Sequence, residues 1–228
     1  KGIIVNHKGL CNVISCVANR MGIQCCDSKD SITEFSLYDA SPTFDTCFLQ
    51  VFPVLWNGGT VIVVPTDPLK PNRCLQFYSH VTFLSTTPRK LFLYKAEDFK
   101  CARNVAVGGE DPSMELYKKW EKANRTLWNL YGPAEISVIT TMGIIKDQVH
   151  MGQAVDNSVL HILNPFQMPV PIGVPGELYI LGDGVAQGYT CEILTKKAFG
   201  IDTKTEQRWY RSGDLVILNH DGILRYIG

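Results

Sequence analysis

Short strand-like and helix-like segments alternate through most of the first 141 residues, and this alternation constrains the fold more than any other feature. Apolar runs predict strands at residues 32–38, 60–64, 81–85 and 104–107 and in the run that ends at Tyr131. The β-branched run 60–64 is expected to be a buried strand. Because parallel neighbours need a crossover connection, usually a helix, the pattern predicts an α/β fold with mostly parallel sheets covered by helices.

Two of the connecting helices have recognisable ends. One begins at Phe44-Asp45, ends at Gly58-Gly59 and places apolar side chains on one face, namely Phe48, Phe52, Leu55 and Trp56. Pro53 inside it is expected to kink or shorten it. The other is expected to be capped by Asp111, to start at Pro112 and to run to about residue 123.

Beyond Thr141 helical periodicity gives way to short strands separated by glycine and proline, at residues 159–163, 177–181, 214–218 and 223–227. This texture predicts a small antiparallel sheet or open, barrel-like subdomain. We therefore expect residues 1–145 to form the α/β part and residues 146–228 a β-rich subdomain.

Charge and composition exclude several classes of partner. With 22 basic and 22 acidic residues, the chain has no net field to attract nucleic acid or a membrane surface. No apolar run approaches the roughly 20 residues that span a bilayer. Without a charged-then-apolar leader, and with 8 cysteines that lack C-x-x-C or metal-site spacing, the chain is expected to be cytoplasmic with reduced thiols.

The run at residues 127–135 ends a predicted strand with an amide, an aromatic ring, a Gly-Pro turn and a carboxylate, at Asn129, Tyr131, Gly132-Pro133 and Glu135. Open α/β sheets commonly bind ligands at such strand ends. On its own the run favours an ordinary strand-to-turn junction with a solvated glutamate. The glycines of residues 182–188 have G-x-G-x-x-x-G spacing without a following amphipathic helix, which argues against a dinucleotide-binding fingerprint. Taken alone, the Arg211-Ser212-Gly213-Asp214 run could be any hairpin turn.

Considered together and in order, these segments resemble the adenylation domains of the adenylate-forming superfamily, most closely the amino-acid-activating domains of non-ribosomal peptide synthetases. The matching segments are Lys1-Gly2 with His7, Phe44-Asp45-Thr46-Cys47 (F-D-x-S), residues 129–135 (N-x-Y-G-P-T-E), residues 176–189 (G-E-L-x-I-x-G-x-G-x-A-x-G-Y) and residues 210–215 (Y-R-T-G-D-L). The resemblance extends over the whole chain. It implies that the family's phosphate loop lies upstream of Lys1 and that a C-terminal lobe with a catalytic lysine lies downstream of Gly228, so these residues alone are expected to be nearly inactive.

The resemblance implies that an amino acid and ATP give an aminoacyl-adenylate and pyrophosphate, followed by transfer to the phosphopantetheine thiol of a carrier protein. Carrier-protein and condensation domains of the same synthetase would be its partners. It also implies roles for single residues: Glu135 for Mg²⁺, Asn129 and Tyr131 for adenine, Asp214 for the ribose hydroxyls, Gly108 and Gly109 for a close backbone approach, and Asp45 for the substrate α-ammonium.

Positions carried over from the family predict a side-chain pocket that contains no charge beyond that of Asp45. Its walls would be Thr46, Leu49, Ser85, Ala106, Gly108, Leu130, Val138 and Ile139. Such a lining predicts a neutral, fairly large and mostly apolar amino acid as substrate. Simple core packing is the alternative for each of these residues.

Three positions depart from the family pattern: Ala134 replaces threonine, Cys47 replaces serine, and Gln50 stands where glutamate is common. Two other functions remain open. An acyl- or aryl-CoA synthetase-like ligase would use a free acid without an α-amine, which Asp45 argues against. A non-catalytic adenylation-like scaffold module would agree with the loss of the hydroxyl at Ala134.

Overall fold

The computed structural model describes residues 2–23, 33–64, 75–121 and 125–228. These residues divide into two compact units. The parallel-sheet unit comprises Ile14–Asn129 and Ile144–Gln148, and the antiparallel-sheet unit comprises Lys1–Val13, Leu130–Gly143 and Val149–Gly228. Each unit is described by itself. Because neither is one continuous stretch, the expected division between residues 145 and 146 stays a prediction.

The strands of the parallel-sheet unit follow the order β3-β2-β4-β5-β6, namely Thr60–Val63, Phe35–Tyr38, Phe83–Thr86, Asn104–Gly108 and Thr126–Tyr131. The pairs β2–β3, β2–β4 and β4–β5 are parallel. The α/β prediction is therefore confirmed. The prediction that residues 60–64 form a buried strand is wrong, because β3 ends the strand order and the side chain of Val63 is 63% exposed.

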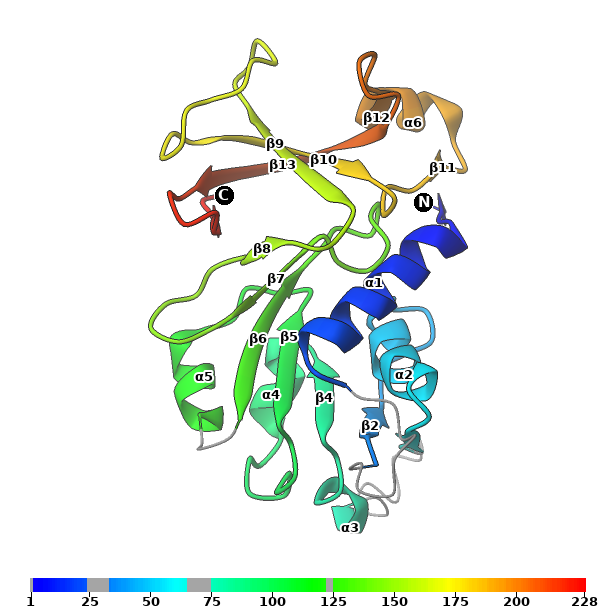
Figure 1. The fold of residues 1–228 in the computed structure, drawn as a ribbon, viewed down its shortest axis with the longest axis vertical. Coiled ribbons are helices and arrows are strands. Elements are labelled where there is room, and N and C mark those ends of the chain that lie inside the picture. Colours follow the sequence, from blue (N-terminus) through cyan, green and yellow to red (C-terminus); the bar gives the residue numbers. More distant parts are fainter. Residues whose placement is uncertain (1, 24–32, 65–74, 122–124) are drawn as a thin grey trace. The chain divides into compact units, whose positions relative to one another are not determined.

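Helices connect these strands (Figure 1): α1 (His7–Arg20, in this unit from Ile14 on), α2 (Thr46–Trp56), α3 (Leu75–Tyr78), α4 (Pro88–Leu93) and α5 (Met114–Trp120). Helix α2 packs against β2, β3 and β4, whereas α4 packs against β5 and α5. The N-cap of α5 is Ser113, whose Oγ accepts a hydrogen bond from Leu116 N at 3.2 Å. The expected cap at Asp111 is thus wrong.

Helix α2 is apolar on nearly all sides, and it runs through Pro53 to Trp56. Its buried residues are Leu49, Gln50, Pro53 and Val54. The apolar face identified from the sequence is instead exposed in part, to 40% at Phe52 and 67% at Trp56. The face of α2 that packs on the sheet includes Gln50, which has the one side-chain amide of the helix.

Aromatic rings form a cluster in the core of this unit. The ring centroid of Phe99 lies 4.8 Å from that of Tyr78 and 5.6 Å from that of Trp120. Arg125 closes the cluster. Its guanidinium donates hydrogen bonds to the carbonyl oxygens of Ala96, Phe99, Ala102 and Trp120 at 2.7–3.4 Å. One side chain thereby satisfies the backbone acceptors of several turns.

In the antiparallel-sheet unit, β12 (Phe199–Ile201), β13 (Arg208–Leu218), β10 (Gly176–Gly182) and β9 (Ser158–Leu163) are neighbours in that order, and β14 (Leu224–Tyr226) pairs with β13. All these pairs are antiparallel. A separate antiparallel pair joins β1 (Ile3–Ile4) to β11 (Gly188–Tyr189). The antiparallel strands β7 (Thr141–Ile144) and β8 (Gln153–Ala154) follow β6 in the strand order of its sheet. The sequence missed α6 (Glu192–Ala198), because helical periodicity was not expected beyond Thr141.

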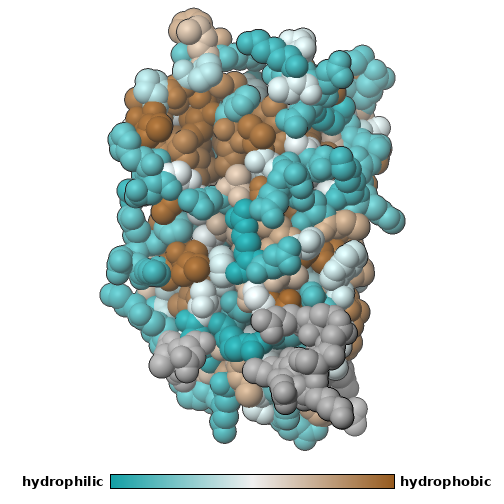
Figure 2. Space-filling model, viewed as in Figure 1, coloured by the Kyte–Doolittle hydropathy of each residue, from teal (hydrophilic) through white to brown (hydrophobic). Residues whose placement is uncertain are grey.

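The core of this unit lies under the antiparallel sheet and includes Ile136, Leu178, Ile180, Phe199 and Val216. Exposed apolar side chains remain on β9 and on the segment that joins it to β10, namely Val159, Phe166, Met168, Ile172 and Val174. Figure 2 shows apolar surface over this sheet. Among the described residues, no helix is long and apolar enough to cross a membrane.

Candidate adenylation site

The turn after β6 folds back tightly on itself. Thr140 N donates to Tyr131 O at 2.8 Å, and a Cβ on Gly132 would lie 2.5 Å from both Ile139 Cα and Val138 O. Those neighbours are backbone atoms that cannot move aside, so the position requires glycine. Val138 has φ of +64°, an unfavourable value for a β-branched residue. Backbone strain of this kind concentrates at functional sites, and no sequence pattern indicates it here.

Strand β6 carries three predicted site residues in succession. In an extended strand, side chains two apart share a face, so Asn129 and Tyr131 lie on one face of β6 and Leu130 on the other. Asn129 and Leu130 are buried, and Tyr131 is half-buried. The two residues predicted to bind adenine are thus on one side of the strand, and the predicted pocket wall is on the opposite side.

Tyr131 and Asp214 are brought together in the antiparallel-sheet unit although 83 positions separate them. The Tyr131 hydroxyl donates a hydrogen bond to Asp214 Oδ2. Burial, and then the hydrogen bond and negative charge of Asp214, raise the pKa of Tyr131, so the hydroxyl stays protonated and donates. Asp214 N in turn donates to Ser212 Oγ at 3.0 Å, and the whole motif lies within β13 rather than at a hairpin turn.

Glu135 lies in the same unit, in the loop after β6. Its carbonyl oxygen accepts from Ala186 N at 2.9 Å, and its side-chain Oε1 accepts from the Tyr189 hydroxyl. Tyr210 adjoins the same carboxylate: burial first, and then the charge of Glu135, raise the pKa of Tyr210. Both tyrosines stand in the motif segments quoted above, yet sequence reasoning gave neither a role.

Asp45 precedes α2 in the parallel-sheet unit, and its side chain makes no capping hydrogen bond to the helix. Burial raises the pKa of the half-buried Asp45 carboxyl, although hydrogen bonds from backbone amides partly oppose this. A carboxylate has about four lone-pair positions, so these backbone contacts leave Asp45 able to accept from a cationic partner.

Backbone elements converge beside Asp45. Gly109, which follows β5, has φ of +79°, and a Cβ there would lie 3.1 Å from the ring of Phe44. The end of β5 at Gly108–Gly109 therefore lies close to the start of α2. Ser85 on β4 and Ala106 on β5 are direct register partners.

The remaining predicted pocket residues of this unit are Thr46, which is half-buried, and Leu49, which is 1% exposed. Ser85 and Ala106 are likewise buried. Leu130, Val138 and Ile139 are buried in the antiparallel-sheet unit. Within each unit these side chains are placed together with core residues, so burial alone does not separate pocket walls from packing.

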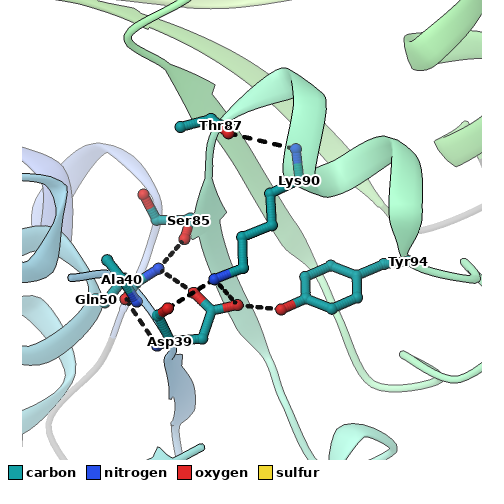
Figure 3. Close-up of polar contacts among 7 residues, drawn as sticks. All are labelled: Asp39, Ala40, Gln50, Ser85, Thr87, Lys90 and Tyr94. Carbon is teal, nitrogen blue, oxygen red and sulfur yellow. Dashed lines mark hydrogen bonds and ion pairs between the residues drawn. The ribbon is translucent and has the colours of Figure 1, made fainter. Parts of the chain in front are cut away.

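Gln50 supports this region through a buried network (Figure 3). Its Nε2 donates to Asp39 Oδ1 at 2.8 Å and to Ser85 O at 2.7 Å, and its Oε1 accepts from the N–H groups of Asp39 and Ala40. Lys90 Nζ lies 2.9 Å from Asp39 Oδ2, and the Tyr94 hydroxyl donates to the same carboxylate oxygen. A glutamate could not make both donations, because even its protonated form has one hydrogen to donate where the amide has two.

A magnesium ion fits the donors present. The described residues contain no group of three or more His, Cys, Asp or Glu side chains able to hold a metal. Mg²⁺ commonly binds through one or two carboxylates together with substrate phosphates. Glu135 would supply one such carboxylate.

Comparisons with known proteins identify the family of the chain. Residues 1–190 match the family model described as AMP-binding enzyme. All of the chain aligns with malpinin synthetase from Mortierella alpina at 34% identity and with bacitracin synthase 3 from Bacillus licheniformis at 29%, covering 3% and 4% of those proteins. The chain thus spans a small part of the curated relatives it matches.

Solved structures share the fold. A non-ribosomal peptide synthetase, FmoA3 in its AMPPNP-bound form, superposes with a TM-score of 0.87 at 22% identity over 99% of this chain and 26% of its own. The Vibrio cholerae adenylation domain AlmE, in complex with glycyl-adenosine-5′-phosphate, gives 0.83 at 24% identity over 99% of this chain and 44% of its own.

Proposed function

The chain belongs to the AMP-binding enzyme family, as an adenylation domain of the non-ribosomal peptide synthetase type, and we propose that it activates an amino acid. A substrate carboxylate oxygen attacks the α-phosphorus of ATP, pyrophosphate leaves, and an aminoacyl-adenylate forms. A carrier-protein phosphopantetheine thiol then attacks the acyl carbon, forming a thioester while AMP leaves. Carrier-protein and condensation domains of the same synthetase are the partners this reaction requires.

The observation that carries the amino-acid assignment is the state of Asp45. Its carboxylate is half-buried and desolvated, and it makes no capping hydrogen bond to α2. A substrate α-ammonium would supply the opposite charge that favours the ionised form. A free-acid substrate, as in an acyl- or aryl-CoA synthetase, would leave that carboxylate without a cationic partner.

Roles in nucleotide binding are proposed residue by residue: for Tyr131, Glu135 and Asp214 in the antiparallel-sheet unit, and for Asn129 and the Gly108–Gly109 backbone in the parallel-sheet unit. Tyr131 would stack on adenine and Asn129 would bond to its edge. Asp214 accepts the Tyr131 hydroxyl at Oδ2, and a carboxylate has further lone pairs for two ribose hydroxyls. Glu135 would hold Mg²⁺, which supplies positive charge against the triphosphate and the attacking carboxylate.

The substrate side chain is proposed to be neutral and mostly apolar. The predicted walls Leu49, Ser85 and Ala106 carry no charge, and the network of Gln50 holds Ser85 by its carbonyl oxygen. A charged side chain in such surroundings would lack a counter-ion, which is costly.

The test is amino-acid-dependent exchange of labelled pyrophosphate into ATP by the full-length protein, with a panel of amino acids and free acids. Asp45→Ala and Asp45→Asn should each lower kcat/KM by about a hundredfold or more, because removing one partner of a buried charge pair costs about 3–5 kcal/mol. Asp147→Ala, at an exposed position, is the control.

Three results would contradict the proposal. Full exchange by Asp45→Ala would remove the ammonium assignment. Preference for acids without an amine would indicate the CoA-ligase alternative, and absence of exchange with every substrate would indicate the non-catalytic scaffold. Preference for a basic or acidic amino acid would refute only the substrate class.

A further inference from the structure

Two tyrosines from separate strands meet at the Glu135 carboxylate. The Tyr189 hydroxyl, at the end of β11, donates to Glu135 Oε1. Tyr210, on β13, adjoins Glu135 and Tyr189, and its ring packs on the same Phe199 ring as that of Tyr189. The three residues lie far apart in sequence, and all belong to the antiparallel-sheet unit.

Packing fixes both rings. Tyr189 meets the ring of Phe199 edge-on at 5.4 Å between centroids, and Tyr210 lies 4.9 Å from the same ring. The backbone N–H of Tyr189 is also held, by Thr195 Oγ1 at 2.9 Å. With 7% and 6% of their surfaces exposed, the two tyrosines have little freedom to turn their hydroxyls elsewhere.

We propose that Tyr189 and Tyr210 are positioning residues that hold the Glu135 carboxylate in the orientation required to bind Mg²⁺ with the nucleotide. The inference rests on the proposed function, because it takes Glu135 as the metal ligand. Mg²⁺ demands near-ideal octahedral geometry, so it tolerates a rotating carboxylate poorly. Hydrogen bonds to ligating carboxylates are worth about 10–100-fold in metal affinity or activity.

The phenols suit this task because they donate without changing the charge of the site. A phenol, whose ordinary pKa is about 10, is a neutral donor at physiological pH. A carboxylate has about four lone-pair positions, and two phenol donors leave it able to accept a cation.

The test measures binding of a non-hydrolysable ATP analogue to the full-length protein by calorimetry, with and without Mg²⁺. Tyr189→Phe and Tyr210→Phe keep the rings on Phe199 and remove one hydroxyl each. We expect each to weaken the Mg²⁺-dependent gain in affinity by about tenfold or more, while affinity without metal stays within about twofold. Tyr179→Phe changes a buried tyrosine of the same sheet whose ring is tilted against Trp209 at 5.6 Å between centroids, and it should behave like the wild type.

A double-mutant comparison completes the test. Adding Tyr189→Phe to Glu135→Gln should cause no further loss of the Mg²⁺-dependent gain, because the tyrosine acts only through the carboxylate. An unchanged gain in both single variants, or equal weakening with and without metal, would overturn the inference. If Tyr189→Phe fails to fold, Tyr210→Phe alone decides.

The same data separate this inference from the proposed function. If the protein binds the analogue with Mg²⁺ coupling that the tyrosine variants weaken, yet exchanges no pyrophosphate, then positioning stands and amino-acid activation fails. If exchange is normal and the variants leave the coupling intact, positioning fails alone. Absence of any Mg²⁺ coupling in the wild type would overturn the positioning role.

Discussion

Replacing Gln50 with glutamate tests the buried network that ties β2, α2, β4 and α4 together (Figure 3). Gln50 is 1% exposed, and its Nε2 is 2.8 Å from Asp39 Oδ1 and 2.7 Å from Ser85 O. An ionised glutamate would place an oxygen at that position, facing a carboxylate and a carbonyl oxygen. The side chain of Asp39 is only 3% exposed, so water cannot screen the repulsion.

The magnitude follows from the choice between ionisation and protonation. Two unit charges about 3 Å apart repel by about 5 kcal/mol at an effective dielectric constant of about 20. Taking up a proton costs less, about 1.4 kcal/mol for each pH unit above the unfolded pKa of about 4.3, or about 4 kcal/mol at pH 7. Protonated glutamate has one donor where the amide had two, which adds about 1 kcal/mol. We expect Gln50→Glu to lower the free energy of unfolding by about 4–5 kcal/mol at pH 7.

The loss should depend on pH in a defined direction. The pKa of the introduced glutamate is raised in the folded protein, so its contribution to stability is fully present below about pH 4.3 and is lost as pH rises through the raised value. As the pH is lowered, the difference in the free energy of unfolding between wild type and Gln50→Glu should therefore shrink by about 1.4 kcal/mol per pH unit, to about 2 kcal/mol at pH 5.

Urea unfolding of wild type and Gln50→Glu between pH 5 and pH 8, followed by tryptophan fluorescence, measures this difference. Gln207→Glu, at an exposed position, should stay within about 0.5 kcal/mol of wild type throughout. A loss below about 1 kcal/mol at pH 7, or one that does not change with pH, would refute the reasoning.

Three further changes test other parts of the structure. Tyr131→Phe removes the donor to Asp214 and should raise the KM for ATP by about tenfold with little change in urea stability; an unchanged KM would contradict the role of that hydrogen bond. Arg125→Met removes donors to four carbonyl oxygens and should cost about 3 kcal/mol in the same urea assay, whereas a loss under about 1 kcal/mol would mean that water replaces the guanidinium. Gly132→Ala would force Cβ to 2.5 Å from backbone atoms and should weaken binding of the ATP analogue at least tenfold; wild-type affinity would show that the turn can relax. The pH profile of kcat/KM for the amino acid should fall on its acid side above the ordinary range of an aspartate, since burial raises the pKa of Asp45 and only its ionised form attracts the ammonium.

The sequence predicted the elements well where one periodicity dominates. The run of residues 104–107 became β5, and the run into Tyr131 became β6. It could not choose the buried face of α2, because a helix that is apolar on nearly all sides satisfies several faces equally. Gln50 determines which face of α2 is buried, because its side chain supplies two donated hydrogens and an acceptor where β2 and β4 end. The hydrophobic periodicity of the sequence contains no information about such hydrogen bonds.

The same limit applies to the site. Motif resemblance related Tyr131, Glu135 and Asp214 to one nucleotide, although the expected division separated Asp214 from the other two, and the structure has all three in the antiparallel-sheet unit. The match to adenylation domains confirms the family. Their roles stay predictions. The hydroxyl that reaches Glu135 comes from Tyr189, 54 positions away, and depends on how β11 is held rather than on any local pattern. Nor does a local pattern require the positive φ of Val138, which arises from the fold-back of the loop.

The kind of donor chosen at each carboxylate is consistent with what that carboxylate is proposed to bind. Glu135 and Asp214 each accept a tyrosine hydroxyl, which orients the group and leaves its negative charge intact. An arginine or lysine would give a stronger hydrogen bond but would cancel the charge that attracts Mg²⁺ at Glu135. Arginine is available nearby, yet Arg211 Nε pairs with Glu177 Oε1 at 2.6 Å. A carboxylate that must receive a cation is thus best held by a neutral donor, and this reasoning predicts that Tyr189→Lys should weaken the Mg²⁺-dependent gain in analogue affinity more than Tyr189→Phe does.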